Sequence, residues 1–316
     1  YEAASAGGRK SVGYMGTLAS NPLDDALVHG IDTHWLSKNG RVAWDMQLLS
    51  SDVDGEMGYG LFTDLSWTPR RGVGHNFSLD ILDDDLDISD LGFLRRNDLI
   101  GMKYRFFRST SQGLPDRLRN RRIGIYSQIY QNTDGRLTES YLGIMGTWLT
   151  KNNLELAANV NFKPQHYDDR NSRGNGTYRK ETGFYSAISL GTSSAKKLAF
   201  SAMLQGRAED LGDVTYVTTL GFTYTPVDRF SVDLDVVLNK RNEWVLYGGD
   251  REFTSYDAFE VQPNLSMDFF ISSKQQLRLK LQWVGIDANQ SHFWSIPEGI
   301  GELVPRFKDL SDSADD

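Results

Sequence analysis

The stretch Phe230-Ser231-Val232-Asp233-Leu234-Asp235-Val236-Val237-Leu238-Asn239 alternates apolar and polar side chains over most of its length. Successive residues of a β-strand point to opposite faces of the sheet, so this alternation predicts a strand with one apolar and one polar face. The stretch 277–283 repeats the pattern, with leucines and Trp283 alternating with Arg278, Lys280 and Gln282. Similar alternation recurs from near Arg9 to about Trp283, so the chain is predicted to be all-β.

The lengths of the alternating segments favour one all-β architecture over another. Strands of soluble proteins usually have about 5–6 residues, whereas a tilted strand that crosses a membrane needs roughly 9–11. Segments of the longer kind include 57–67, 122–130, 137–149 and 214–224. We therefore predict an antiparallel, transmembrane β-barrel of an outer membrane with roughly 14 or more strands. The alternative is a soluble β-sandwich that acts as a binding protein.

Composition excludes several classes of protein. The mean hydropathy is −0.45, and no window approaches the roughly 20 apolar residues that a membrane helix requires. The formal net charge is −8, which argues against a nucleic-acid partner. The chain has no cysteine, so disulfides and thiolate metal sites are excluded.

The ends and connections of the chain shape its predicted organisation. We interpret residues 1–316 as a single β-barrel domain, expected to be a fragment of a longer exported protein and incomplete at its ends. The segment 286–316 is expected to be a loop or a boundary. Short turns are expected on one rim of the barrel and long loops, at 83–98, 109–120 and 166–180, on the other.

The polar side chains of the strands are the expected lining of the barrel lumen. Those that we assign to it are Glu155, Asn159, Asp233, Asp235, Arg278 and Lys280. Aromatic residues near segment ends are expected to form girdles at the membrane boundaries. They include Trp35, Trp44, Trp67, Tyr104, Phe106 and Tyr130.

One segment, Asp87-Ile88-Ser89-Asp90-Leu91-Gly92-Phe93-Leu94-Arg95-Arg96-Asn97-Asp98, carries a specific motif centred on Leu91-Gly92-Phe93. It resembles the signature of an outer-membrane β-barrel domain of unknown function that occurs C-terminal to a domain like carbohydrate-binding family 9. The resemblance implies a location in the bacterial outer membrane. It also implies a link to glycans through an N-terminal domain that this chain lacks.

The same segment predicts a plug or a latch at the barrel rim, formed by Asp87, Asp90, Leu91, Gly92, Phe93, Arg95 and Arg96. In this interpretation, the two arginines pair with aspartates of the loop. The alternative is that they form a constriction that selects anionic solutes. A second basic cluster, Arg117, Arg119, Arg121 and Arg122, is a candidate site for anions such as lipopolysaccharide phosphates, with a solvated loop base as the alternative.

No catalytic residue, metal site or cofactor is predicted. The five histidines are scattered, without the spacing of a metal site. Enzyme activity is therefore not expected of this chain, although a longer parent protein could be linked to glycan processing. The predicted function is a channel or transport component of the bacterial envelope, with membrane lipids and lipopolysaccharide as partners. The alternative is a membrane anchor that displays a carbohydrate-binding or glycan-processing domain.

Overall fold

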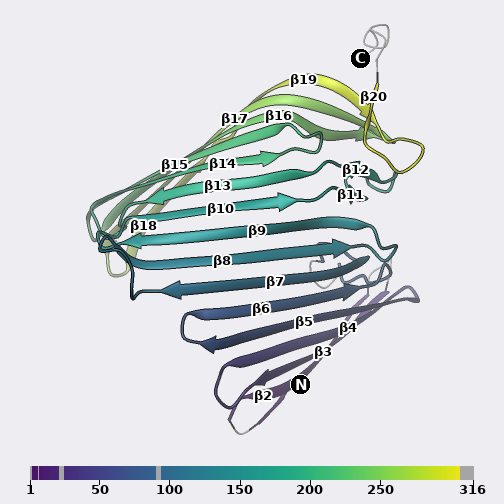
Figure 1. Ribbon diagram of the computed structural model, residues 1–316, viewed down its shortest axis with the longest axis horizontal. Helices are drawn as coiled ribbons and strands as arrows, with labels where there is room; N and C mark the ends of the chain where they lie inside the picture. The colour runs from purple at the N-terminus through teal and green to yellow at the C-terminus, as the bar shows by residue number, and fades with distance from the viewer. Residues whose placement is uncertain (1, 6, 21–24, 90–93, 307–316) are drawn as a thin grey trace. The chain divides into compact units, whose positions relative to one another are not determined.

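A computed structural model describes the chain except residues 1, 6, 21–24, 90–93 and 307–316. The described residues form 20 strands and no helix, and the strand pairings are antiparallel, which confirms the all-β prediction (Figure 1). Within this described part, no helix is long and apolar enough to cross a membrane. The chain divides into two compact units, with unit 1 at 1–109 and 124–142 and unit 2 at 110–123 and 143–316.

Unit 1 contains an antiparallel meander in which each strand pairs with the next along the chain. Its strands are β1 (Glu2–Ala4), β2 (Lys10–Ser20), β3 (Asp25–Leu36), β4 (Val42–Val53), β5 (Glu56–Arg70), β6 (Val73–Leu82) and β7 (Leu99–Thr110). Asp54 and Gly55 join β4 to β5 with φ angles of 53° and 90°. Positive φ at both central residues is typical of a type I′ hairpin turn, which matches the twist of the paired strands.

β8 (Leu118–Gln131) and β9 (Leu137–Thr150) contribute residues to both units. The remaining strands of unit 2 are β10 (Glu155–Lys163), β11 (His166–Asp168), β12 (Tyr178–Lys180), β13 (Gly183–Gly191), β14 (Leu198–Ala208), β15 (Val214–Val227), β16 (Phe230–Gly249), β17 (Glu252–Ser272), β18 (Gln275–Gln282), β19 (Gly285–Ser295) and β20 (Val304–Arg306). β10 and β13 to β17 form a second meander. One edge of β17 pairs with β18 along its second half and with β19 along its first half.

The segment 286–316 was expected to be a loop or a boundary, and the loop expectation is wrong for residues 286–295, which lie in β19. β19 occupies most of its first part and pairs with β17 from Val261↔Gly285 to Glu252↔Ser295. The polar run Asn289-Gln290-Ser291-His292 interrupts the alternation of side chains and hides the strand in the sequence. Backbone hydrogen bonding to β17, which does not depend on side-chain type, forms the strand. Residues 307–316 lie outside the described part.

The distribution of long loops also differs from the prediction. In unit 2, the Lys151 backbone N–H donates to the Arg117 carbonyl at 3.0 Å. The 111–117 connection therefore lies beside the short β9–β10 turn. The 164–182 connection lies at the other strand end, where Arg179 N–H donates to the Gly301 carbonyl at 2.7 Å. Placing 109–120 with the other long loops was wrong.

Each unit has one apolar and one polar face, and the apolar face is exposed. On the strands of unit 2, Phe162, Ile188, Leu204 and Leu220 are 49–54% exposed. Their neighbours along each strand point to the opposite face, where Asn161 and Asn239 are buried. Apolar cores among the described residues are confined to small clusters under the connections between strands. The pattern of exposure is therefore the reverse of a soluble sandwich, whose apolar faces are buried against each other.

Candidate functional site

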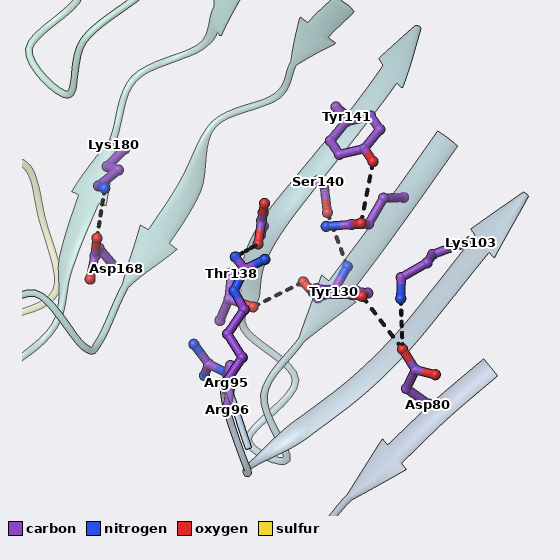
Figure 2. A network of polar contacts seen from close by, with 12 residues as sticks. Asp80, Arg95, Arg96, Lys103, Tyr130, Thr138, Ser140, Tyr141, Asp168 and Lys180 are labelled. Atoms are coloured by element: carbon purple, nitrogen blue, oxygen red, sulfur yellow. Dashed lines mark hydrogen bonds and ion pairs between the residues drawn. The ribbon is translucent and has the colours of Figure 1, made fainter. Parts of the chain in front are cut away.

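The polar face of unit 1 carries an ion pair between two neighbouring strands. The Lys103 ammonium on β7 lies 3.0 Å from the Asp80 carboxylate on β6. The Tyr130 hydroxyl on β8 donates to the same carboxylate oxygen at 3.4 Å. Figure 2 shows both side chains pointing toward Asp80. Asp80 is only 8% exposed, and a buried carboxylate needs such a cation and donor to offset the loss of its hydration.

A glycine makes room for this arrangement. Gly101 pairs with Asp80 across β6 and β7. A Cβ atom at this position would lie 2.6 Å from Cε1 of Tyr130. The Tyr130 ring therefore fits over the sheet only because position 101 has no side chain. Around it, Thr138 donates to the Tyr130 carbonyl and Tyr141 donates to Gln128, each at 3.3 Å, so the cluster is extended by hydrogen bonds (Figure 2).

The described parts of the connection 83–98, residues 83–89 and 94–98, fold over the polar face of unit 1. Gly58 and Gly60 on β5 belong to this face, because the register pairs Gly60 with Leu82 and sets both on the side of Asp80. A Cβ atom at Gly58 would lie 2.3 Å from Cα of Leu86 and 2.4 Å from the Asp85 carbonyl oxygen. The loop backbone therefore lies directly against the glycine. Leu86 is 1% exposed and packs in a cluster with Leu82, Leu99 and Tyr130.

Polar contacts fix both ends of this infolded loop. At its start, the Asp83 carboxylate accepts from the Tyr59 N–H at 2.8 Å, and Asp87 N–H donates to the Ser51 hydroxyl at 3.1 Å. At its end, the Asn97 amide donates to the Asp84 carbonyl at 2.6 Å. Asp98 accepts from the backbone and the hydroxyl of Thr133 at 2.7 and 2.6 Å. These contacts hold the described parts of the loop, residues 83–89 and 94–98, against unit 1.

The structure places part of the predicted plug motif. The Arg95 guanidinium forms an ion pair at 2.6 Å with Glu139 on β9, which was not among the partners expected for it. Arg96 lies 3.9 Å from Asp98. Hydrogen bonds from the side chain and backbone of Ser89 lower the pKa of Asp87. Asp90, Leu91, Gly92 and Phe93 lie outside the described residues.

The polar residues assigned to a lumen all lie on one face of the unit 2 sheet. Glu155 and Asn159 lie on this face of β10. The pairing registers of β13, β14 and β15 place Asp233 and Asp235 of β16 on the same face, which continues across β17. Arg278 and Lys280 on β18 continue it. Asp233 accepts from the Thr223 hydroxyl at 2.7 Å, and Arg278 pairs with Asp268 at 2.6 Å. That this face lines a lumen remains a prediction.

The basic cluster at the start of β8 does not form one site. Arg119 and Arg121 have the same strand parity as Ile123 and Ile125, so these four side chains lie on the apolar face. Arg122 points to the opposite face. The Arg119 guanidinium donates to the Asn153 side chain at 2.9 Å. Arg117 precedes the strand. The structure thus divides these arginines between two faces, and anion binding by them remains a prediction.

The connection 164–182 of unit 2 is a packed cap rather than an open loop. β11 and β12 form a hairpin within it, and Tyr178 packs with Phe253, Val245, Ile296 and Leu303. The cap also contains an ion-pair cluster. The Lys180 ammonium lies 2.6 Å from Asp168 and 3.0 Å from Asp210; Figure 2 shows its contact with Asp168. The Tyr178 hydroxyl also donates to Asp210 at 3.0 Å.

Charge and burial act in opposite directions on the pKa values of Lys180 and Asp168. Burial favours neutral Lys180, but the carboxylates of Asp210 and Asp168 outweigh it and raise the pKa of Lys180. Burial likewise opposes ionised Asp168, yet Lys180 and backbone N–H groups lower the pKa of Asp168. Burial and the same two carboxylates raise the pKa of Tyr178. The cap therefore holds an ionised lysine and aspartate with a neutral tyrosine at neutral pH.

Sequence reasoning missed Asp80 and Lys103, and it assigned Tyr130 to an aromatic girdle. That assignment was wrong, because Tyr130 is buried on the polar face. The alternation of β8 contained the signal. Ile125 and Ile129 are 44% and 54% exposed, and Tyr130 has the opposite parity. Among the described residues, no three His, Asp or Glu side chains gather as they would around a metal ion.

Comparisons with known proteins identify a family but no activity. A family model described as "Domain of unknown function (DUF5916)" matches residues 16–313. No curated protein matches the chain. The solved structures similar to it include the siderophore receptor PirA from Acinetobacter baumannii, with 7% sequence identity and a TM-score of 0.46. That similarity covers 90% of this chain and 58% of the receptor chain. The predicted association with a carbohydrate-binding domain is not tested by these matches.

Proposed function

The chain belongs to the DUF5916 family, and we propose that it is an outer-membrane β-barrel domain that acts as a channel or transport component of the bacterial envelope. The observation that carries the proposal is the exposed apolar face of both units. Burying a side chain such as Phe or Leu stabilises a protein by about 1.5–3 kcal/mol. Soluble proteins rarely leave large contiguous apolar patches in water. Lipid would cover this face.

Aromatic side chains on the apolar face of unit 1 support the proposal. The strand registers set Trp35, Trp44, Phe77 and Tyr104 in one row across β3, β4, β6 and β7. A second row lies two residues nearer the strand ends and contains Trp67 on β5, His75 on β6 and Phe106 on β7. Rings aligned near strand ends are typical of the boundary between lipid and water, where aromatic side chains gather.

Strand length is a further support. A tilted strand needs roughly 9–11 residues to cross the hydrocarbon core. Most strands in the meanders of both units reach that length, and β16 and β17 have 20 and 21 residues. An antiparallel sheet with one lipid-facing side can then present its polar side to an aqueous lumen. The polar face would provide the path for a solute.

The anchor remains the second candidate, because the described parts of the infolded loop 83–98 are fixed over the polar face of unit 1. In an anchor, a loop that fills the lumen would be compatible with function. A displayed carbohydrate-binding or glycan-processing domain, and glycans as its ligands, belong to this second proposal. In either case we propose membrane lipids as the partners of the apolar face and no catalytic role for this chain.

The two faces of β13 allow a matched test of membrane insertion. We expect Ile188→Lys to reduce insertion into lipid vesicles, because a lysine on the lipid-facing side of a barrel costs about 2–4 kcal/mol near the bilayer midplane. Ile188 is 50% exposed on the apolar face. Ser189→Lys adds the same charge to the polar face and should insert normally. Insertion is measured by protease protection. If the protein stayed soluble and monomeric and did not insert into vesicles, the result would support the β-sandwich alternative and refute the membrane proposal.

The Asp80–Lys103 pair allows a test of transport. We expect Lys103→Gln to raise the permeability ratio of cations to anions by about two- to fivefold, because 1 kcal/mol of electrostatic energy corresponds to about fivefold. The substitution removes the cation that balances Asp80. The reversal potential in a KCl gradient across a planar bilayer measures the ratio, and Lys103→Arg is the control that keeps the charge. A steady conductance with an unchanged reversal potential would show that solutes do not pass Lys103.

A further inference from the structure

One end of unit 1 carries cations and no carboxylates in its turns. The β1–β2, β3–β4 and β5–β6 connections lie at this end, together with the end of β7, because neighbouring strands are antiparallel. The β5–β6 turn is visible at the left of Figure 1. We call the exposed cations here the basic turn surface: Arg9, Lys10, Lys38, Arg41, Arg70, Arg71 and Arg108. Segments 5–10, 37–41 and 68–72 contain no Asp or Glu.

These cations are unpaired, unlike those at the opposite end of the same unit. In the part of the chain that the structure describes, no side chain of the basic turn surface forms an ion pair. At the other end, Arg95 pairs with Glu139, Arg96 with Asp98 and Arg136 with Asp134. The net charge of the chain is −8, so its excess of carboxylates lies elsewhere. The positive charge of this surface is therefore available to an external anion.

The basic turn surface adjoins the aromatic rows on the apolar face. Lys10 pairs directly with Trp35 across β2 and β3. Arg108 lies on the same face of β7 as Phe106, one step closer to the strand end. Lys and Arg beyond a row of aromatic side chains can extend along the apolar surface and place their charges at the level of lipid phosphates. This continuity indicates a partner that meets the apolar face and the strand ends together.

We propose that the basic turn surface binds the phosphate groups of anionic membrane lipids and thereby favours one orientation of the chain in the membrane. The inference rests on the proposed membrane-spanning function. A nucleic acid or an acidic protein would match the charge but not the adjoining aromatic face. A lipid layer matches both, because its hydrocarbon contacts the apolar side chains while its headgroups meet the cations.

The test compares insertion into neutral and anionic vesicles. The complete chain is folded into vesicles of phosphatidylcholine alone or with about one third phosphatidylglycerol. We expect a preference for anionic vesicles and a single orientation, detected by protease cleavage from outside. Lys10→Gln with Arg41→Gln and Arg108→Gln should lower the preference by on the order of tenfold, since each cation near an anionic surface contributes about fivefold before salt screening.

The control removes as much charge from the polar face, with Arg105→Gln, Lys163→Gln and Lys280→Gln. It should keep both the lipid preference and the orientation. If both triple variants lost the preference equally, net charge alone would account for binding and the proposal would be wrong. Insertion that is equal in neutral and anionic vesicles would also refute it, while leaving the membrane proposal intact. Failure of the unmodified chain to insert in either vesicle would instead refute the membrane proposal, and the inference with it.

Discussion

Gly58→Val is expected to release the infolded loop 83–98 and to raise conductance through the protein. The valine Cβ would lie 2.3 Å from Cα of Leu86 and 2.4 Å from its nitrogen. Because these atoms belong to the backbone, no side-chain rotation can relieve the clash. The loop must leave the polar face. Leu86 would then lose a nearly complete burial, which stabilises a leucine by about 1.5–3 kcal/mol.

The release can be measured in two independent ways. The chain has no cysteine, so Ile88→Cys gives a single labelling site in the loop without background. We expect faster maleimide labelling at this site in the Gly58→Val protein, together with larger conductance steps in planar bilayers. Gly191→Val is the control, because a Cβ at Gly191 would meet nothing within 4 Å.

The two readouts distinguish the proposed functions. Conductance in the unmodified protein, increased by Gly58→Val, would support a channel narrowed by the loop. If the unmodified protein showed no conductance and the Gly58→Val protein did, the result would support an anchor whose lumen the loop fills. Unchanged labelling would show that the loop does not occupy the polar face, contrary to the structure.

Lys180→Met is expected to open the cap of unit 2 locally. The substitution leaves the Asp168 and Asp210 carboxylates without the ammonium that lies 2.6 and 3.0 Å from them. Removing one partner from a buried ion pair costs about 3–5 kcal/mol. The three side chains are 17–22% exposed, so we expect about 3 kcal/mol, at the lower limit of that range. Hydrogen exchange in 164–182 should accelerate roughly 100-fold.

Two controls separate this effect from a general loss of charge. Lys196→Met removes an exposed lysine from a turn of the same unit and should leave hydrogen exchange unchanged. Adding Asp168→Asn and Asp210→Asn to Lys180→Met removes the uncompensated carboxylates, and should restore part of the protection. If Lys180→Met exchanged as slowly as the unmodified protein, the ion pairs would not hold the cap.

The same cap should keep its charge pairs over a wide pH range. Folding lowers the pKa of Asp168, so its contribution is present above the ordinary value of 3.8 and is lost as pH falls below that value. Folding raises the pKa of Lys180, so its contribution is present below 10.5 and is lost as pH rises above that value. Hydrogen exchange in the cap, corrected for its intrinsic pH dependence, should stay slow between these limits.

The sequence by itself determined the strands that alternate apolar and polar side chains, and the two faces of those strands. Alternation with a period of two is a local property, and each strand carries it independently of its neighbours. For this reason the six residues from Glu155 to Lys280 that were assigned to one polar face do share a face. The alternation of β8 also predicts the polar face for Tyr130, because Ile125 and Ile129 have the opposite parity and are exposed.

Only the tertiary structure decided how the connections pack. The infolding of 83–98 depends on Gly58, which is 28 positions from Leu86 in the sequence. The two residues come into contact only after the strands of the β4–β6 meander have paired. The cap likewise joins Tyr178 to Phe253 and Ile296, and β19 forms where β17 offers a free edge. Such contacts join distant parts of the chain and have no period. No local pattern encodes them, because their free energy depends on surfaces that exist only after the strands have paired.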